Sequence, residues 1–286
     1  MTKAKDIAIA RHKALMDELH EKVVSLTTGE EWLNYLKFAA RFRKYSFNNQ
    51  ILIWMQAPEA EFVAGYKKWQ ELGRQVQEGA KAIRIFGFRE YNREVEVDGE
   101  MVTERRVFHP TAKVFNYTDT KPREGAQRVF EPQTFAERLA GSDEAGIFVR
   151  LSEWLRVEAG YTVSRETLSG SMNGYTTVDG TKRVVVSDEV EDAQAAKTLI
   201  HEAAHVLLHV ADGGEDYRAH RGLCEVEAES VAFVVAGSLG LDTSSYSVGY
   251  VAQWAEADYD LIESTGKRVL TTAQRLTEVL TDEGRG

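Results

Sequence analysis

Apolar residues recur at helical spacing along the front of the chain and then give way to short runs rich in β-branched and aromatic residues. The helical period predicts helices over residues 5–26, 30–43, 47–56 and 66–72, the last of them ended by Gly73. The strand-like runs cover residues 82–88, 94–97, 105–108 and 113–117. Asp98-Gly99 is a hairpin turn signal between the second and third of these runs. The front of the chain is therefore expected to be an α+β domain.

A segment with proline, glycine and no clear period follows, and we expect a linker over residues 124–143. It separates a first domain, residues 1–123, from a second domain, residues 144–286. The second domain opens with a predicted helix over 145–159 and three predicted strands over 161–165, 174–178 and 182–187. Asp179-Gly180 is the hairpin turn between the last two strands. Only helices are expected after them, over residues 190–211, 222–238, 248–264 and 267–281.

Length and composition fit a globular protein, with 286 residues of which 43% are hydrophobic. No apolar run approaches the ~20 residues that cross a bilayer, and the first residues lack the apolar core of a signal peptide. We therefore expect a cytoplasmic protein without a membrane partner. Cys224 is the single cysteine, which excludes an intrachain disulfide and a cysteine-based zinc site. The sequence leaves the oligomeric state open.

The net charge of −10 is unevenly distributed along the chain. Residues 1–128 carry 22 Lys+Arg and 18 Asp+Glu, whereas residues 129–286 carry 13 and 27. A mildly basic front half and a strongly acidic rear half predict two domains with different partners. Because DNA is a polyanion, any DNA binding is expected in the front half alone and with strong salt dependence.

The sequence His201-Glu202-Ala203-Ala204-His205 is the strongest chemical signal in the chain. On a helix, residues four apart lie on one face, so the imidazoles of His201 and His205 can reach one metal ion. Glu202 adjoins the first ligand and is placed to act as the general base that deprotonates a water molecule. The pattern predicts a zinc site of the hydrolase type.

Zinc with an open position for water needs a third protein ligand. The other histidines are candidates, and so is the acidic cluster of Glu225, Glu227 and Glu229. Glu225 lies on the next predicted helix, and an antiparallel return of that helix brings it opposite the two histidines. Because a helix turns by ~100° per residue, Glu227 points away from Glu225 and Glu229. His209 could extend the histidine face, but a partner beneath the site is the more common role for such a residue.

The two histidines followed by a glutamate on the next helix resemble gluzincin metallopeptidases, and the segments His201–His209 (HEAAHVLLH) and Glu225–Glu229 (EVEAE) also resemble ImmA/IrrE-type metallopeptidases. In gluzincins the third ligand is a glutamate on the following helix, and an acidic residue four positions later orients a ligand histidine. The resemblance implies Glu225 as the third ligand ahead of Glu229, with Glu229 in the orienting role. It also implies a zincin-like domain, a short antiparallel sheet plus helices, with Zn²⁺ as cofactor and an unidentified protein as substrate.

Between residues 37 and 93, basic residues alternate with aromatic residues, and this segment has 11 Lys+Arg against 5 Asp+Glu. Cationic groups neutralise phosphates and exposed rings stack on unpaired bases, so this composition suits single-stranded nucleic acid. The alternative is that most of the rings belong to a core. The candidate DNA-contacting residues are Arg41, Arg43, Lys44, Tyr45, Asn48, Asn49, Trp54, Lys67, Lys68, Trp69, Arg74, Lys81 and Arg84.

Several segments in the same order resemble ArdC-type antirestriction proteins. They are residues 45–54 (YSFNNQILIW), 64–76 (AGYKKWQELGRQV), 114–120 (VFNYTDT) and 250–254 (YVAQW). Two departures are Gly79-Ala80-Lys81-Ala82, where the family has Gly-Glu-Lys-Gly, and Gly87-Phe88, where the family strand ends near a proline. The resemblance implies a single-stranded DNA-binding domain followed by a zincin-like metallopeptidase domain.

Three functions are compatible with these features. The first is a protein that protects single-stranded DNA of a mobile element or phage from restriction, with zinc-dependent peptidase machinery. The second is an ImmA/IrrE-like regulatory protease that cleaves a DNA-bound repressor. The third is a non-enzymatic single-stranded DNA-binding module with a structural metal. The sequence does not identify the protease substrate, the DNA preference or the restriction system.

Overall fold

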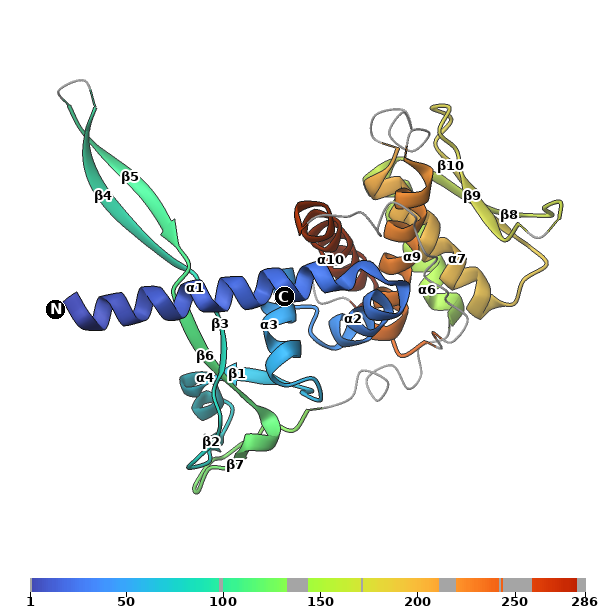
Figure 1. Cartoon of the computed structure of the whole chain (residues 1–286). Helices are drawn as coiled ribbons and strands as arrows, with labels where there is room; N and C mark the ends of the chain where they lie inside the picture. The colour runs from blue at the N-terminus through green and yellow to red at the C-terminus, as the bar shows by residue number, and fades with distance from the viewer. Residues whose placement is uncertain are drawn as a thin grey trace. The chain divides into compact units, whose positions relative to one another are not determined.

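The computed structural model describes residues 2–97, 100–132, 144–170, 172–210, 220–241, 243 and 259–281. The chain divides into two compact units (Figure 1). The front unit comprises Met1–Lys22 and Asn48–Pro132, and the rear unit comprises Val23–Phe47 and Gln133–Gly286. Each unit combines helices with short sheets, as the α+β prediction requires.

This division differs from the expected boundary at residue 123, because residues 23–47 pack with the rear unit. The helix α2 (Gly29–Arg41) contacts α9 (Arg221–Ser238). Trp32 of α2 is 0% exposed, and its Nε1 donates a hydrogen bond to Ser230 Oγ of α9 at 2.8 Å. The rear unit therefore includes a segment that precedes most of the front unit in the sequence.

The described part of the expected linker, residues 124–132, packs on the front unit. The backbone N–H of Phe130 donates to Leu72 O at 2.9 Å, and the Phe130 ring contacts Phe62 and Trp69. Residues 133–143 lie outside the described residues. The folded part of the front unit thus extends at least seven residues beyond the expected domain end, because Phe130 completes its small core.

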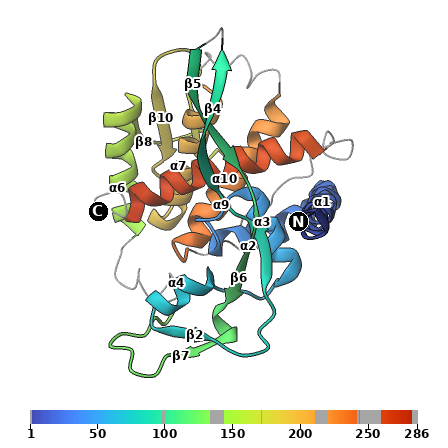
Figure 2. The ribbon, with the colours of Figure 1, turned by 90° about the vertical axis from the view of Figure 1, so that its left-hand side faces the viewer.

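The front unit contains α1 (Thr2–Val24) up to Lys22, α3 (Phe47–Gln56) from Asn48 onward, and α4 (Tyr66–Glu71). The 3₁₀ turn η1 (Ser25–Thr27), which follows α1, belongs to the rear unit. An antiparallel sheet has the order β1-β6-β3, and two further antiparallel pairs are β2-β7 and β4-β5. The strands are β1 (Val63–Gly65), β2 (Arg74–Val76), β3 (Ile83–Phe86), β4 (Arg89–Val97), β5 (Glu100–Phe108), β6 (Thr111–Asn116) and β7 (Thr120–Pro122), with the 3₁₀ turn η2 (Tyr117–Asp119) before β7. Figure 2 shows α4 beside the β2-β7 pair. The turn at Asp98-Gly99 lies outside the described residues, but β4 and β5 pair as the hairpin signal predicts.

Two amide side chains of α3 hold the outer edge of β3. Asn49 donates to Phe86 O and accepts from Phe86 N–H, at 2.9 and 2.8 Å. Gln56, two turns further along α3, makes the same pair of hydrogen bonds to the backbone of Arg84, at 2.8 and 3.0 Å. Because β3 has a strand neighbour on one side only, these amides take the place of a second neighbouring strand.

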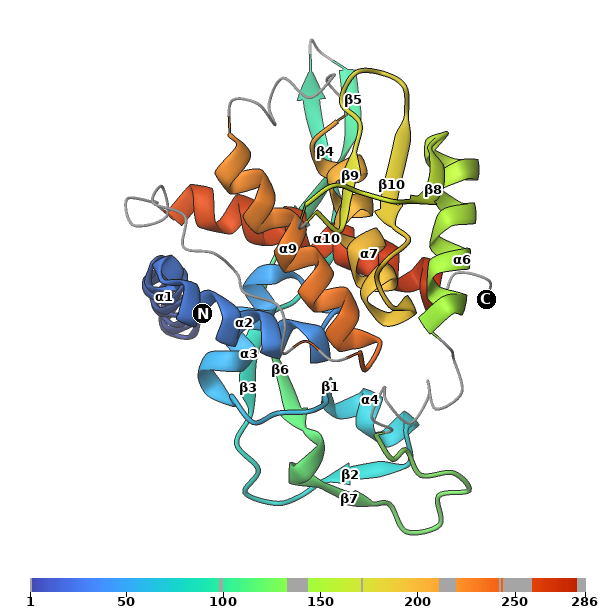
Figure 3. The same ribbon diagram turned by 90° about the vertical axis from the view of Figure 1, so that its right-hand side faces the viewer.

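The rear unit contains the sheet β8-β10-β9, with β8 (Thr162–Glu166), β9 (Gly174–Thr176) and β10 (Arg183–Ser187). The β9-β10 pair is the predicted hairpin, whereas β8 runs parallel to β10, so the sheet is mixed and not wholly antiparallel as expected. Figure 3 shows this sheet lying along α7. The remaining helices are α6 (Glu144–Trp154, continued by the π-turn η3, Leu155–Ala159), α7 (Asp192–Leu208), α9 and α10 (Tyr259–Thr281).

The prediction of two C-terminal helices separated near residue 266 is wrong, because α10 runs unbroken through Gly266. A Cβ atom at this position would lie 2.1 Å from Cε2 of Phe47. Glycine is therefore present for close packing against a buried ring and not as a helix stop. Most of the predicted helix 248–264, including residues 250–254, lies outside the described residues.

Among the described residues, no helix is both long enough and apolar enough to span a membrane.

Candidate metal centre

The motif residues lie on α7, whose alanine-rich middle has neither glycine nor proline. Small side chains let α7 pack closely against its neighbours, and it contacts α6, α9, α10, β9 and β10. Glu202 and His205 are buried and His201 is partly buried. The helix thus presents its two histidines from the interior of the rear unit toward α9, which carries the acidic cluster.

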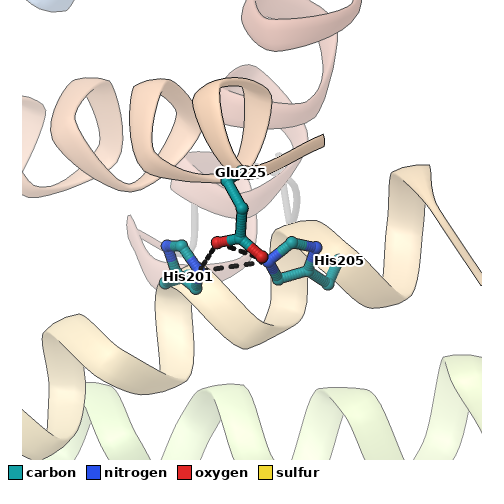
Figure 4. A group of neighbouring side chains, drawn as sticks. All are labelled: His201, His205 and Glu225. Carbon is teal, nitrogen blue, oxygen red and sulfur yellow. Dashed lines mark hydrogen bonds and ion pairs between the residues drawn. The ribbon is translucent and has the colours of Figure 1, made fainter. Parts of the chain in front are cut away.

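Three donor atoms from α7 and α9 converge on one point (Figure 4). His201 Nε2 and His205 Nε2 lie 3.1 Å apart, and Glu225 Oε2 lies 3.5 and 3.7 Å from them. Ligands at ~2.0–2.1 Å from a tetrahedral ion are separated by about 3.3–3.4 Å, which this triangle brackets. Two imidazole nitrogens and a carboxylate oxygen are also the donor set that a catalytic zinc site uses. The residues therefore fit a divalent metal ion.

Glu229 lies one helical turn beyond Glu225 on α9 and contacts the opposite nitrogen of His201, with Oε2 at 3.1 Å from Nδ1. Burial opposes protonation of this imidazole, but hydrogen bonds with Glu225 and Glu229 and the charge of Glu202 outweigh it. They raise the pKa of His201 to about 10. The carboxylates of Glu225 and Glu229 thus favour a positive charge at His201, and a metal cation bound by the donor triangle would supply a positive charge at the same place.

Glu202 is fixed by the neighbouring strand β9. The hydroxyl of Thr176 donates to Glu202 Oε2 at 2.7 Å. Gly174 lets β9 approach α7 closely, because a Cβ there would lie 2.6 Å from Thr198 Cγ2 and 3.5 Å from Glu202 Cγ. Thr176 belongs to no sequence motif, and its only signal in the sequence is its place in the hairpin that precedes the motif helix.

A second set of contacts lies beneath His205. Its Nδ1 lies 3.0 Å from Nδ1 of His209, and His209 Nε2 lies 2.8 Å from Glu227 Oε2. Arg268 of α10 lies 3.1 Å from the same oxygen. Burial lowers the pKa of His209, which favours the neutral ring. His209 is thus a partner beneath the site, as expected. Glu227 is the hydrogen-bond partner of His209, a contact that the sequence did not predict.

The candidate DNA-contacting residues differ widely in exposure. Four of them, Arg41, Arg43, Lys44 and Tyr45, belong to the rear unit, and the others to the front unit. The exposed candidates are Arg41, Lys44, Lys67, Lys68 and Lys81. The partly buried candidates are Arg43, Tyr45, Asn48, Asn49, Trp54 and Arg84.

Two candidates are core residues in this structure. Trp69 is 0% exposed, packs against Ala64 and Val76, and donates from Nε1 to Phe115 O at 2.9 Å. Arg74 is 4% exposed, and its guanidinium donates to the Oγ1 of Thr120 and to Glu131, both at 2.7 Å. The alternation of basic and aromatic residues predicted them as DNA contacts because such a pattern reports composition and not burial.

Three partly buried candidates also have contacts within the front unit. Asn49 holds β3 as described above. Lys22 Nζ lies 4.3 Å from the centre of the Trp54 ring, a cation–π contact, and Arg84 lies 3.9 Å from Glu18. Among the front-unit candidates, Lys67, Lys68 and Lys81 are exposed, and Lys68 also pairs with Glu71 at 3.0 Å.

Comparison with known proteins assigns a class to each part of the chain. The model of the N-terminal domain of anti-restriction factor ArdC matches residues 11–116. The model of the IrrE N-terminal-like domain, peptidase M78, matches residues 157–244, which contain the three donor residues. The chain therefore combines an ArdC-type N-terminal domain with an M78 peptidase-like domain, and its metal-ligand cluster indicates a divalent-metal site.

Whole-chain comparisons give the particular relatives. The metal-free crystal structure of the antirestriction ArdC protein from R388 plasmid has a TM-score of 0.52 at 21% identity, over 83% of this chain and 86% of that chain. Its Mn(II)-bound structure has a TM-score of 0.47 at 21% identity, over 84% and 90%. The uncharacterized protein pXO2-81 of Bacillus anthracis is 23% identical over 88% of this chain and 48% of its own length. The chain has the two-domain ArdC-like fold, and it spans about half the length of that curated relative.

Proposed function

We propose that the rear unit is a zinc-dependent metallopeptidase centre, with His201, His205 and Glu225 as ligands and Glu202 as general base. The observation that carries the proposal is the donor triangle with edges of 3.1, 3.5 and 3.7 Å beside a buried, oriented carboxylate. Glu229 is assigned the role of orienting His201 through Nδ1. The match to an M78 peptidase-like domain supports the same reaction class.

The protein residues divide the work of hydrolysis between them. A bound Zn²⁺ supplies Lewis acidity toward a peptide carbonyl and toward water. Thr176 occupies Oε2 of Glu202, which leaves Oε1 to accept the proton of the attacking water. The buried position of Glu202 limits competing solvent, so the proton accepted there is available for the leaving amine.

The proposal is tested with Glu202→Gln, which keeps the shape of the side chain but removes the base. A mixture of quenched fluorescent peptides of varied sequence reports cleavage with and without Zn²⁺. We expect the wild type to cleave and the variant to bind zinc equally while losing ~10²–10⁴-fold in rate. Glu278→Gln, an exposed carboxylate of α10, is the matched control. Equal rates for wild type and Glu202→Gln would refute the assignment of the base.

We further propose that the front unit binds single-stranded DNA and that the protein acts in antirestriction, protecting DNA of a mobile element or phage. The ArdC N-terminal domain match and the exposed lysines Lys67, Lys68 and Lys81 support this proposal. Fluorescence anisotropy with single-stranded and duplex oligonucleotides across a salt series tests it. Lys67→Ala/Lys68→Ala should reduce the salt slope by about 1–2, since each phosphate contact contributes about one unit. Lys267→Ala, an exposed lysine of the rear unit, should leave binding unchanged.

The IrrE-like match favours one second candidate, a regulatory protease that cleaves a DNA-bound repressor. The two functions differ in what Glu202→Gln does in a cell that receives unmodified DNA. If protection depends on DNA binding alone, the variant protects as well as the wild type. If proteolysis is required, protection is lost and a cleaved partner protein accumulates only with the wild type.

A further inference from the structure

A continuous row of polar side chains runs from the donor triangle through the interior of the rear unit. It starts at His205, passes through His209 and Glu227, and ends at Arg268. His209 and Glu227 are each 1% exposed, so water does not compete for these hydrogen bonds. We call these four residues the His205 relay. It draws on α7, α9 and α10, and thus joins three helices at the site.

The chemistry of the groups allows one direction for the hydrogen bonds of the relay. A histidine that offers Nε2 as a lone pair to a metal ion carries its proton on Nδ1. His205 Nδ1–H must then donate to Nδ1 of His209, which must be the bare nitrogen of that ring. The proton of His209 is consequently on Nε2, and it donates to Glu227 Oε2. Arg268 donates to the same oxygen and compensates the charge of this buried carboxylate.

We infer that His209 and Glu227 are positioning residues that set the tautomer of the ligand His205. The carboxylate of Glu227 accepts but cannot donate, so it draws the His209 proton to Nε2. The bare Nδ1 of His209 in turn draws the His205 proton to Nδ1 and leaves Nε2 free toward the donor triangle. The opposite tautomer of His209 would place two N–H groups face to face at 3.0 Å. This inference rests on the proposed metal centre.

The two ligand histidines are therefore oriented by different means. His201 contacts the carboxylate of Glu229 directly, at a partly exposed position. His205 reaches a carboxylate only through a second imidazole, at a buried position. His209, the third histidine of HEAAHVLLH, thus neither binds the metal nor only fills space, but sets the tautomer of the ligand His205.

The experiment uses the whole chain of residues 1–286 freed of metal, with histidine side chains labelled with ¹⁵N. Long-range ¹H–¹⁵N spectra distinguish the two ring tautomers, and the chain has 7 histidines to assign. Zinc affinity is measured on the same samples by competition with a chromophoric chelator. His209→Leu removes the acceptor, His209→Asn restores an acceptor near the Nδ1 position, and Glu227→Met removes the carboxylate. Thr198→Val, a buried polar residue of α7 outside the relay, is the matched control.

In the wild type we expect His205 protonated on Nδ1 and His209 on Nε2. His209→Leu and Glu227→Met should give mixed tautomers of the remaining ring and weaken zinc binding by ~10–100-fold. His209→Asn should recover part of the affinity, and Thr198→Val should keep all of it. If His209→Leu fails to fold, the tautomer of His209 in Glu227→Met decides the question.

Wild-type tautomers and zinc affinity in both His209→Leu and Glu227→Met would overturn the relay while leaving the metal centre intact. Failure of the wild type to bind zinc would overturn the metal centre itself, and the relay with it. The two failures are therefore distinguishable in one set of samples.

Discussion

Gly174→Ala tests whether the close approach of β9 to the motif helix is required. The added Cβ would lie 2.6 Å from Thr198 Cγ2 and 3.0 Å from Val185 O. Neither neighbour moves easily, since one is backbone and the other is a short β-branched side chain on α7. The strand must therefore shift away from α7, and the bond from Thr176 to Glu202 must lengthen with it.

Two effects of opposite sign determine the magnitude. Alanine is favoured over glycine in a strand by ~0.5–1 kcal/mol because it restricts the unfolded chain. Overpacking a close contact costs ~1–3 kcal/mol. A contact of 2.6 Å lies far inside the normal separation of carbon atoms, so the second effect dominates. We expect the free energy of unfolding of the rear unit to fall by about 1–2 kcal/mol.

Urea unfolding of the metal-free protein, followed by circular dichroism, measures the change. Thr198→Ser removes the Cγ2 methyl group, so the double variant Gly174→Ala/Thr198→Ser should recover most of the loss relative to Thr198→Ser alone. Peptide cleavage by Gly174→Ala should also fall, because Glu202 loses its fixed partner. A Gly174→Ala protein as stable as the wild type, or a double variant without recovery, would refute the packing argument.

The pKa of His201 is raised to about 10, so metal binding below pH 10 should release a proton from His201, and zinc affinity should increase with pH up to that value. Calorimetry in buffers of different ionisation enthalpy detects this proton, and zinc binding without proton release at pH 7.5 would contradict the argument. Gly266→Ala should lower the free energy of unfolding by ~1–3 kcal/mol, whereas Gly237→Ala, whose Cβ would meet Ala40 Cβ at 3.2 Å, should change it little; equal effects in chemical denaturation would contradict this. Asn49→Ala should cost ~1–3 kcal/mol and speed amide exchange at Phe86, and unchanged exchange would contradict the bracing of β3.

Local pattern predicted the elements of this fold well, because each signal lies within one segment. The predicted helices 30–43, 47–56 and 66–72 correspond to α2, α3 and α4. The hairpin around residues 179–180 is confirmed by the pairing of β9 with β10. The shared face of His201 and His205 also follows from helix geometry alone, and a carboxylate oxygen of Glu225 lies near both of them.

Features that depend on packing between distant segments were not predictable in this way. Helix geometry predicts that Glu227 points away from Glu225 and Glu229, but it does not predict the contact with His209, which depends on how α9 packs against α7. In the sequence, a glycine that ends a helix looks the same as one that makes room for a packed ring, as Gly266 does for Phe47. The depth of Trp69 and Arg74 depends on residues 120–131, which the period of the sequence does not link to them.

The division of the chain also predicts which fragments fold. The helix α2 lies within the matched ArdC N-terminal domain but buries its apolar side in the rear unit. Its fully or nearly fully buried side chains are Trp32, Tyr35, Leu36 and Phe38. Each large apolar side chain removed from such contacts costs ~1.5–3 kcal/mol, so losing all four is comparable with the ~5–15 kcal/mol that stabilises a whole domain.

A fragment of residues 144–286 should therefore show no cooperative thermal transition, whereas residues 23–286, which retain α2, should keep the transition of the rear unit. Circular dichroism melts of both fragments beside the full chain measure this. A cooperative melt of 144–286 at the temperature of the full chain would show that α2 is dispensable. DNA binding and peptide cleavage are therefore best compared in variants of the whole 286-residue chain, because truncation at residue 123 or 144 separates α2 from α9.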